Sequence, residues 1–285
     1  MEKWRIFLKI LFISLGVGFT VSGIIFFFAY NWNDLDKFLK IGLMQLLLAG
    51  SVAVVLHPKV SFQTRQIVLT GASLLVGALF AVFGQIYQTG ANAYDFFLNW
   101  TIFIALWAII SQFPPLWLIF IALINTTFML YSQQVADWME VFVYTILFLF
   151  NSVLVILFLF FSKKKKYIRV PNWFLYVIAL AAVCFSIFGF IYGTDMNSGG
   201  AGSFEILIFL SLLLYPLGIG YGLKVKNGFY LVILSLSILL IIITLWLKYI
   251  EGDDSGILLC LFIIISVVGL IAAFVHLQKQ WKNET

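Results

Sequence analysis

The chain has 285 residues, of which 63% are hydrophobic and 10% are charged, and its mean hydropathy is +1.09. A soluble domain has about a quarter of its residues charged, so this composition excludes a folded soluble protein and requires lipid as the solvent. The net charge of +5 does not indicate a nucleic-acid partner, because basic residues flanking apolar spans are expected on the cytoplasmic side of a membrane protein.

Apolar segments of about 20 residues, the length that crosses the hydrocarbon core, follow one another along the whole chain. We predict an all-α, polytopic transmembrane helix bundle in a single membrane domain, residues 1–285, with five spans up to residue 131 and five more in residues 132–285. The predicted spans are residues 10–30, 38–56, 67–86, 95–112, 115–131, 141–161, 173–192, 204–222, 229–247 and 257–277.

Three segments give further predictions. The first apolar run follows Lys3, Arg5 and Lys9, but it is too long for a signal peptide and has no Ala-x-Ala cleavage site, so we expect a retained helix. Pro114 and Pro115 predict a tight hairpin between the fourth and fifth spans. Residues 193–203 are rich in Gly and Ser and predict a flexible outer loop.

The distribution of charge predicts the orientation. With the N-terminus inside, 14 of the 17 basic residues are cytoplasmic, and only Lys37, Lys40 and Lys248 lie outside. Ten of the 12 acidic residues lie outside. Cytoplasmic segments carry an excess of Lys and Arg, so we predict that both termini are cytoplasmic and that the chain is a multi-pass protein of a bacterial cytoplasmic (inner) membrane.

One basic run has two interpretations. Lys163, Lys164, Lys165 and Lys166, followed by Arg169, can bind anionic lipid headgroups. The same run is also typical of a stop-transfer anchor, which needs no specific lipid.

Polar and aromatic residues gather where the first and third spans end and the fourth begins, all on the predicted outer side. Asp95 and Asn99 are spaced i,i+4, so both side chains can point into one cavity. We predict an outward-facing, ligand-binding polar pocket with aromatic walls. The alternative is an interface belt of Trp and Tyr with amides that cap or bridge helices. The candidate ligand-binding residues are Asn31, Trp32, Gln85, Tyr87, Gln88, Tyr94, Asp95, Asn99 and Trp100.

Small and polar residues also form a stripe along the third span, at Thr70, Ser73, Gly77, Ala81, Gly84 and Gln88. Such a stripe lets a neighbouring helix approach closely, or it can line a path. We expect packing, with Ser14, Gly18 and Ser22 of the first span as the partner surface.

The residues give no sign of a cofactor or a metal site. His57 and His276 lie far apart, and Cys184 and Cys260 both sit in apolar stretches. There is no Ser–His–Asp set, HExxH motif or phosphate-binding loop. No Asp, Glu, Lys, Arg or His falls at mid-depth of a predicted span, which argues against proton-coupled transport. An intramembrane pair of aspartates is also missing, which makes an enzyme the less favoured class.

Residues 14–131 resemble the bacterial membrane-protein family catalogued as domain of unknown function 2157. The resemblance is carried by Ala29-Tyr30-Asn31-Trp32 and by the run from Gly84 to Trp100, GQIYQTGANAYDFFLNW. It implies a membrane protein and singles out the same outer cluster, but it implies no activity.

Three hypotheses follow. The first is binding or transport of a small polar or amphipathic ligand from outside. The second is a scaffold or accessory subunit of a cell-envelope complex, with another membrane protein as partner. The third is a membrane enzyme acting on lipid or glycan, with Asp95 as acid or base and Asp34 as the second titratable group.

Overall fold

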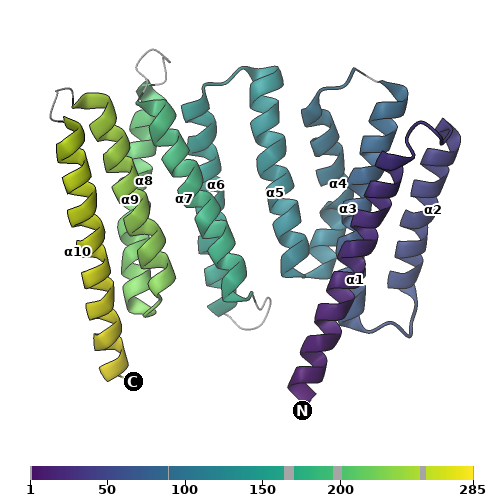
Figure 1. Cartoon of the computed structure of the whole chain (residues 1–285), viewed down its shortest axis with the longest axis horizontal. Helices are drawn as coiled ribbons and strands as arrows, with labels where there is room; N and C mark the ends of the chain where they lie inside the picture. The colour runs from purple at the N-terminus through teal and green to yellow at the C-terminus, as the bar shows by residue number, and fades with distance from the viewer. Residues whose placement is uncertain (1, 89, 164–169, 195–200, 251–254, 285) are drawn as a thin grey trace. The chain divides into compact units, whose positions relative to one another are not determined.

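A computed structural model describes residues 2–88, 90–163, 170–194, 201–250 and 255–284 (Figure 1). Within these residues every regular element is helical, and ten helices are long and apolar enough to cross a membrane. This confirms the predicted all-α architecture of ten spans, whereas the orientation of the termini stays a prediction. The run Lys163–Lys166 lies outside the side chains that the structure describes.

The ten helices follow the ten predicted spans one for one. They are α1 (Glu2–Tyr30), α2 (Lys37–Leu56), α3 (Phe62–Tyr87), α4 (Ala93–Ser111), α5 (Pro114–Tyr131), α6 (Glu140–Lys163), α7 (Asn172–Gly193), α8 (Ala201–Lys224), α9 (Gly228–Tyr249) and α10 (Ser255–Asn283). A π-helical turn, η1 (Ser132–Ala136), occupies the start of the break expected after the fifth span.

The helices extend beyond the predicted spans because apolar character marks the hydrocarbon core, whereas helical hydrogen bonding ends at a cap. The side chain of Asp36 accepts the N–H of Phe38 at 2.8 Å and starts α2. Asn227 accepts the N–H of Phe229 at 3.0 Å and starts α9. Such caps satisfy N–H groups that have no partner inside the helix. The predicted hairpin at the two prolines is confirmed, with Pro114 opening α5.

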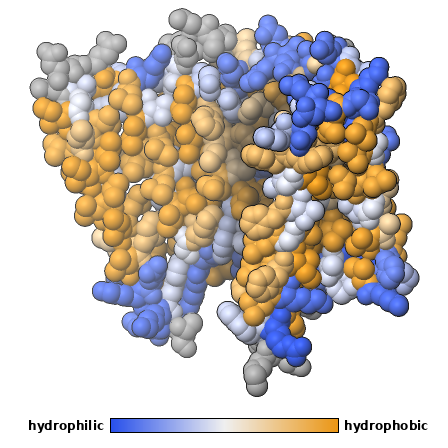
Figure 2. Space-filling model, turned by 45° about the vertical axis from the view of Figure 1, so that its right-hand side comes forward, coloured by the Kyte–Doolittle hydropathy of each residue, from blue (hydrophilic) through white to orange (hydrophobic). Residues whose placement is uncertain are grey.

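The surface matches a lipid environment. On the face shown in Figure 2, apolar side chains cover the middle of the helices and polar side chains gather at the helix ends. Large apolar residues such as Phe19, Ile110 and Leu212 are more than two-thirds exposed, as expected for side chains that contact lipid rather than water. The protein therefore sits in a bilayer.

The chain divides into two compact units, Met1–Ala136 and Asp137–Thr285, and each is described by itself. The prediction of a single membrane domain stays a prediction. In the first unit α3 is the central helix and packs against α1, α2 and α4. One core lies between α3, α4 and α5 around Val76, Ile104 and Leu116, and another lies between α1, α2 and α3 around Phe28 and Met44.

The small residues of α3 allow neighbouring helices to pack closely. The helix that packs against Gly77 is α4, whereas the predicted partner was α1. A Cβ atom at Gly77 would lie 2.5–2.6 Å from three atoms of the Trp100 indole of α4, so that ring packs directly against Gly77. The contact with α1 is made on a different face of α3, where Gly71 meets Val17. Gly18 has nothing within 4 Å of a Cβ, so the prediction that it forms the partner surface is wrong. A small residue permits a close approach, but its sequence does not say which helix makes it.

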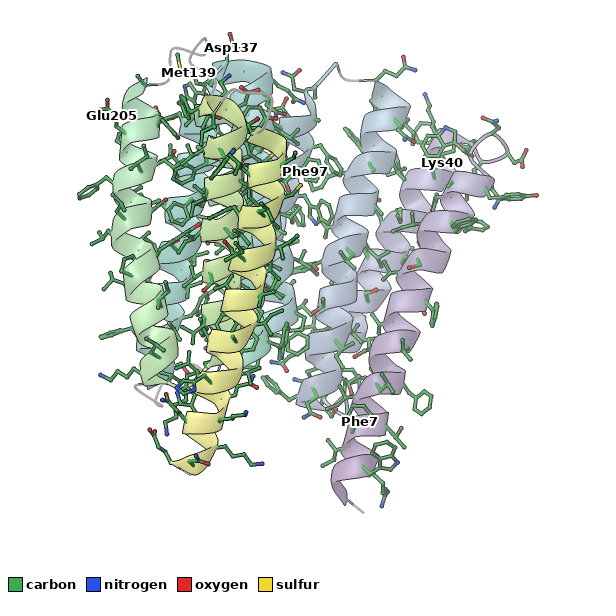
Figure 3. All side chains as sticks on the ribbon, turned by 60° about the vertical axis from the view of Figure 1, so that its left-hand side comes forward. Phe7, Lys40, Phe97, Asp137, Met139 and Glu205 are labelled. Carbon is green, nitrogen blue, oxygen red and sulfur yellow. The ribbon has the colours of Figure 1, made fainter. Side chains whose placement is uncertain are left out.

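In the second unit α7 is the central helix and packs against α6, α8 and α9, whereas α10 packs against α9. Its core holds a buried polar link between three helices. The hydroxyl of Tyr215 on α8 donates to Ser186 Oγ of α7 at 3.1 Å and lies 2.6 Å from Ser237 Oγ of α9. Polar groups buried among lipid-embedded helices need such partners, and this link fixes the register of the three helices. In Figure 3, Asp137, Met139 and Glu205 lie at one end of this unit.

Candidate functional site

The hairpin between α3 and α4 holds an open cavity of about 740 Å³. Its wall is made by the last two turns of α3, the connecting segment and the first two turns of α4. Its apolar lining includes three phenylalanines, Phe80, Phe83 and Phe96. The polar lining side chains are Gln85, Gln88, Asn92, Asp95 and Asn99.

The backbone opens this space at the end of α3. Gln88 adopts the left-handed conformation, with φ of 41°, and its N–H donates to the carbonyl of Gly84 at 3.0 Å. Gly90 follows with φ of 64°, a conformation that favours glycine. A Cβ on Gly84 would meet nothing within 4 Å, so this glycine borders free space rather than a packed neighbour. The sharp exit from α3 therefore leaves a gap between the helix ends.

Asp95 serves as a capping residue of α4. Asn92 is the N-cap, and its N–H donates to Asp95 Oδ2 at 3.1 Å in a capping box. A carboxylate in the first turn also interacts favourably with the positive end of the helix dipole. The predicted start of this span at Asp95 is two residues late, because the helix begins at Ala93. The capping role suggested by the alternative interpretation is thus present, and the same carboxyl group lines the cavity.

Capping gives a stability prediction. Asp95→Ala removes the acceptor for the N–H of Asn92 and is expected to lower the free energy of unfolding by about 1 kcal/mol, as is typical for loss of a cap. Asp95→Asn keeps an oxygen acceptor and is expected to change it little. Thermal denaturation of both variants in one detergent is the measurement. Equal losses for Asn and Ala would contradict a capping hydrogen bond at this position.

Asn99 lies one turn deeper in the cavity than Asp95. Its Nδ2 donates to the Asp95 carbonyl at 2.8 Å, which fixes the amide along the helix. Gln85 and Gln88 face the same space from α3. The structure thus places four of the nine predicted site residues around one cavity: Gln85, Gln88, Asp95 and Asn99.

Three other predicted site residues near the hairpin make contacts elsewhere. Trp100 points at α3, where its Nε1 donates to the Ser73 carbonyl at 2.8 Å. The ring of Tyr94 packs edge-on against Tyr131, with centroids 5.4 Å apart. The ring of Tyr87 packs at a tilt of 43° against Phe83 of its own helix, with centroids 4.5 Å apart. These aromatic residues do not line the cavity.

The remaining two belong to the junction of α1 and α2. Asn31 Nδ2 donates back to the Phe27 carbonyl at 2.9 Å. Trp32 packs into the core around Phe28 and Met44, and Lys40 Nζ lies over its ring at 4.1 Å from the centroid. Lys40 is only 8% exposed, so its ammonium group rests on an aromatic face at the end of the helix. Figure 3 shows Lys40 and Phe7 at opposite ends of this unit.

The phenylalanine walls were not among the predicted site residues. A signal was available, because Phe80, Gly84 and Gln88 are spaced i,i+4 and share one face of α3. Asp95 is the only titratable side chain among the described residues that line the cavity, and Asp34 is not among them. Within the described part of the chain no group of three or more His, Cys, Asp or Glu residues could hold a metal ion.

One comparison with known proteins supports the assignment as a membrane protein. No curated protein and no solved structure matches the chain. Residues 3–117 match the family model described as "Predicted membrane protein (DUF2157)", and this confirms the resemblance read from the sequence. The matched segment includes every residue that lines the cavity. The chain is thus a membrane protein with ten candidate transmembrane helices in its described residues, and its residues 3–117 are similar to the family with domain of unknown function 2157.

Proposed function

We propose that the α3–α4 cavity binds a small amphipathic ligand that enters from the outer side of a bacterial cytoplasmic membrane. The observation that carries this proposal is the make-up of the cavity: a carboxyl group and four amides stand beside phenylalanine rings in about 740 Å³ of open space. Ligand sites typically combine apolar walls with a few placed polar groups.

The charge of the lining indicates the kind of ligand. Asp95 supplies a negative charge, and no Lys or Arg is among the described residues that line the cavity. Aromatic rings beside a carboxylate favour a cation, because the ring face and the carboxylate both carry negative potential. A ligand with an ammonium group and a short apolar tail fits best, with the tail against Phe80 and Phe96.

Binding is better supported than ion-coupled transport. Several buried polar residues within the helices form local hydrogen bonds, as Asn151 does with the Leu147 carbonyl at 2.8 Å. Among the buried polar side chains that the structure describes, Lys40 is the only charged one, and it lies in the first turn of α2 rather than at mid-depth. Proton-coupled carriers need titratable groups along the path.

The experiment uses butylammonium and butyrate as probes of equal length and opposite charge. Saturation-transfer NMR on the full chain in nanodiscs, with empty nanodiscs subtracted, should detect butylammonium and not butyrate. Gly84→Leu should weaken the signal, because the leucine would occupy part of the cavity at a position where a Cβ meets no neighbour within 4 Å. Asp95→Asn should weaken it while the protein stays folded.

The control is Gly18→Leu, which adds the same side chain where a Cβ meets nothing within 4 Å. It should bind butylammonium as the unmodified chain does. Equal signals from butylammonium and butyrate, or an undiminished signal in Gly84→Leu, would overturn the proposal.

A scaffold or accessory role is the second candidate, and α10 favours it. The apolar window of this helix has no residue buried within the chain, so a membrane-protein partner has room to pack there. Stable co-purification with one membrane protein would favour this role. An enzyme acting on lipid or glycan has the least support, because the cavity lining offers Asp95 without a second titratable group.

A further inference from the structure

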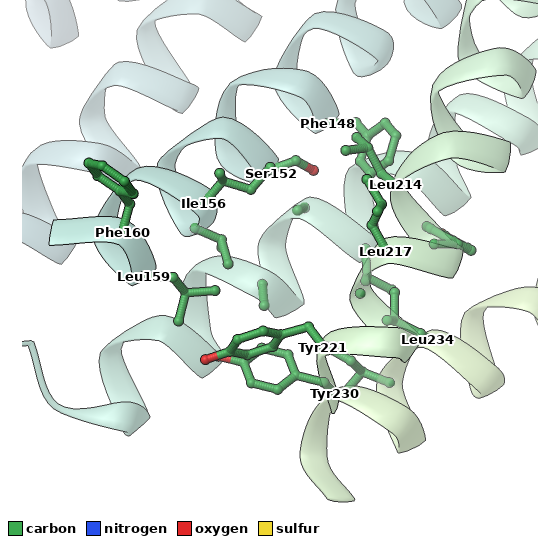
Figure 4. Close-up of a pocket in the computed structure, with 17 residues that line it drawn as sticks. Phe148, Ser152, Ile156, Leu159, Phe160, Leu214, Leu217, Tyr221, Tyr230 and Leu234 are labelled. Carbon is green, nitrogen blue, oxygen red and sulfur yellow. The ribbon is translucent and has the colours of Figure 1, made fainter. Parts of the chain in front are cut away.

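The second unit contains a cavity of about 340 Å³ among α6, α7, α8 and α9 (Figure 4). Its walls are α6 and α8, which contribute Ile156 and Leu217 among others. Its floor is made by α7 and α9, through Ala179, Ala182 and Leu234. The cavity belongs to a different unit from the α3–α4 site, so its occupant is independent of the proposed function.

Burial shows that this cavity is a groove with a deep floor. Ala179, Ala182 and Leu234 are at most 7% exposed, whereas Ile156, Phe160 and Leu217 on the rim are more than half exposed. Alanines on the floor leave space that larger side chains would fill, whereas Gly218 on the α8 wall admits the side chain of Leu234, whose Cδ1 lies 2.7 Å from the position of a Cβ on Gly218. The groove therefore opens to the lipid between α6 and α8.

The length of the groove corresponds to one leaflet. On α6 it runs from Phe148 to Phe160, which is about 18 Å at the helical rise of 1.5 Å per residue. Half of the hydrocarbon core of a bilayer is about 15 Å. An extended hydrocarbon segment that enters from one membrane surface would fill the groove and stop at its closed end.

The closed end is formed by Tyr215 and Phe148, whose rings pack edge-on with centroids 6.2 Å apart. The hydrogen bonds of Tyr215 to Ser186 and Ser237 hold this end in place. These contacts lie at the depth where a chain from one leaflet would end.

The opposite end of the groove is polar. Tyr221 and Tyr230 pack edge-on with centroids 5.6 Å apart, and their rings lie together at one end of the groove in Figure 4. Lys224 follows in the last turn of α8. Phenol groups and a lysine at a helix end mark the level of lipid headgroups.

Water is a poor occupant of the rest of the groove. A buried water molecule needs two to four polar partners, and apart from the three tyrosines Ser152 is the only polar side chain among the described residues that line the groove. The volume of about 340 Å³ is more than twice that of an apolar cavity of about 150 Å³ that binds benzene. The solvent at its open side is hydrocarbon.

We propose that this groove holds one acyl chain of a membrane phospholipid, with the headgroup at the end marked by Tyr221, Tyr230 and Lys224. The chain lies between α6 and α8 on the alanine floor of α7 and ends against Tyr215. It is a site for a bound lipid, distinct from the lipid that covers the exposed helix faces.

The test is photo-labelling of the full chain in nanodiscs that contain phosphatidylcholine with a diazirine in the middle of one acyl chain. Mass spectrometry of the digested protein locates the adducts. The groove floor around Ala179 and Ala182 should carry several-fold more label than Ile264 and Ile265 of α10, which are at least 60% exposed and report ordinary surrounding lipid.

Two variants narrow the groove from opposite walls. Ser152→Phe acts from α6, and Leu217→Trp acts from α8 at a position that is 60% exposed and so is little constrained by packing. Each should reduce label on the floor several-fold and leave label on α10 unchanged. Ser152→Ala is the matched control and should label as the unmodified chain does.

Label on the floor no denser than on α10 would overturn the proposal. Undiminished label in a folded Leu217→Trp variant would do the same. Because the second variant changes an exposed rim position, the test stands even if Ser152→Phe does not fold.

Discussion

Gly77→Leu is expected to lower the melting temperature of the detergent-solubilised protein strongly. The new side chain would occupy the place of the Trp100 indole, which lies 2.5 Å from the position of a Cβ on Gly77. Trp100 would have to leave, and its hydrogen bond to the Ser73 carbonyl would be lost. Overpacking of a tight core costs about 1–3 kcal/mol, and the lost bond adds about 0.6 kcal/mol, the average for hydrogen bonds between membrane helices.

The matched control for Gly77→Leu is Gly18→Leu on α1. Both changes replace a helical glycine with the same residue, but a Cβ on Gly18 meets nothing within 4 Å. Leucine also has the better helix propensity, so Gly18→Leu should leave the melting temperature unchanged or raise it slightly. If both variants melt at the same temperature as the unmodified protein, the Trp100 ring does not pack against Gly77.

The second large effect concerns orientation. In a variant without Cys184 and Cys260, single cysteines at Asn33 and Met139 should react with a membrane-impermeant thiol reagent in intact cells. Cysteines at Lys59 and Lys226 should react only after the membrane is permeabilised. All four positions are exposed in the structure, so a lack of reaction would report the side of the membrane and not burial.

The physical reason for this orientation is the distribution of basic residues. Lysine and arginine are retained on the cytoplasmic side during insertion, and the N-inside arrangement puts 14 of the 17 there. Residues 164–169 and 195–200, which also bear on the orientation, lie outside the described part of the chain. Reaction at Lys59 in intact cells together with protection of Asn33 would reverse the orientation of the first unit, and the Met139 and Lys226 pair tests the second unit separately.

The sequence by itself determined the helices. A bilayer leaves the backbone no partner but itself, so each apolar segment of about 20 residues must be helical. Turn residues such as Pro114 and Asn227 then mark the connections. The i,i+4 spacing of Asp95 and Asn99 also placed both residues on one side of α4, and both line the cavity. The family resemblance rested on short runs of consecutive residues, which can be recognised without the structure.

Tertiary structure alone decided which neighbour each side chain meets. From the sequence, Trp100 could belong to an interface belt or to a pocket wall. Only the approach of α4 to Gly77 makes it a residue that packs between the two helices. Gly71 and Gly77 lie on one helix, yet they contact α1 and α4 respectively. The groove above Ala182 is a space left between four helices. In lipid, every helix face can be apolar whether it is buried or not, so hydrophobic periodicity does not report packing, and only the arrangement of the helices does.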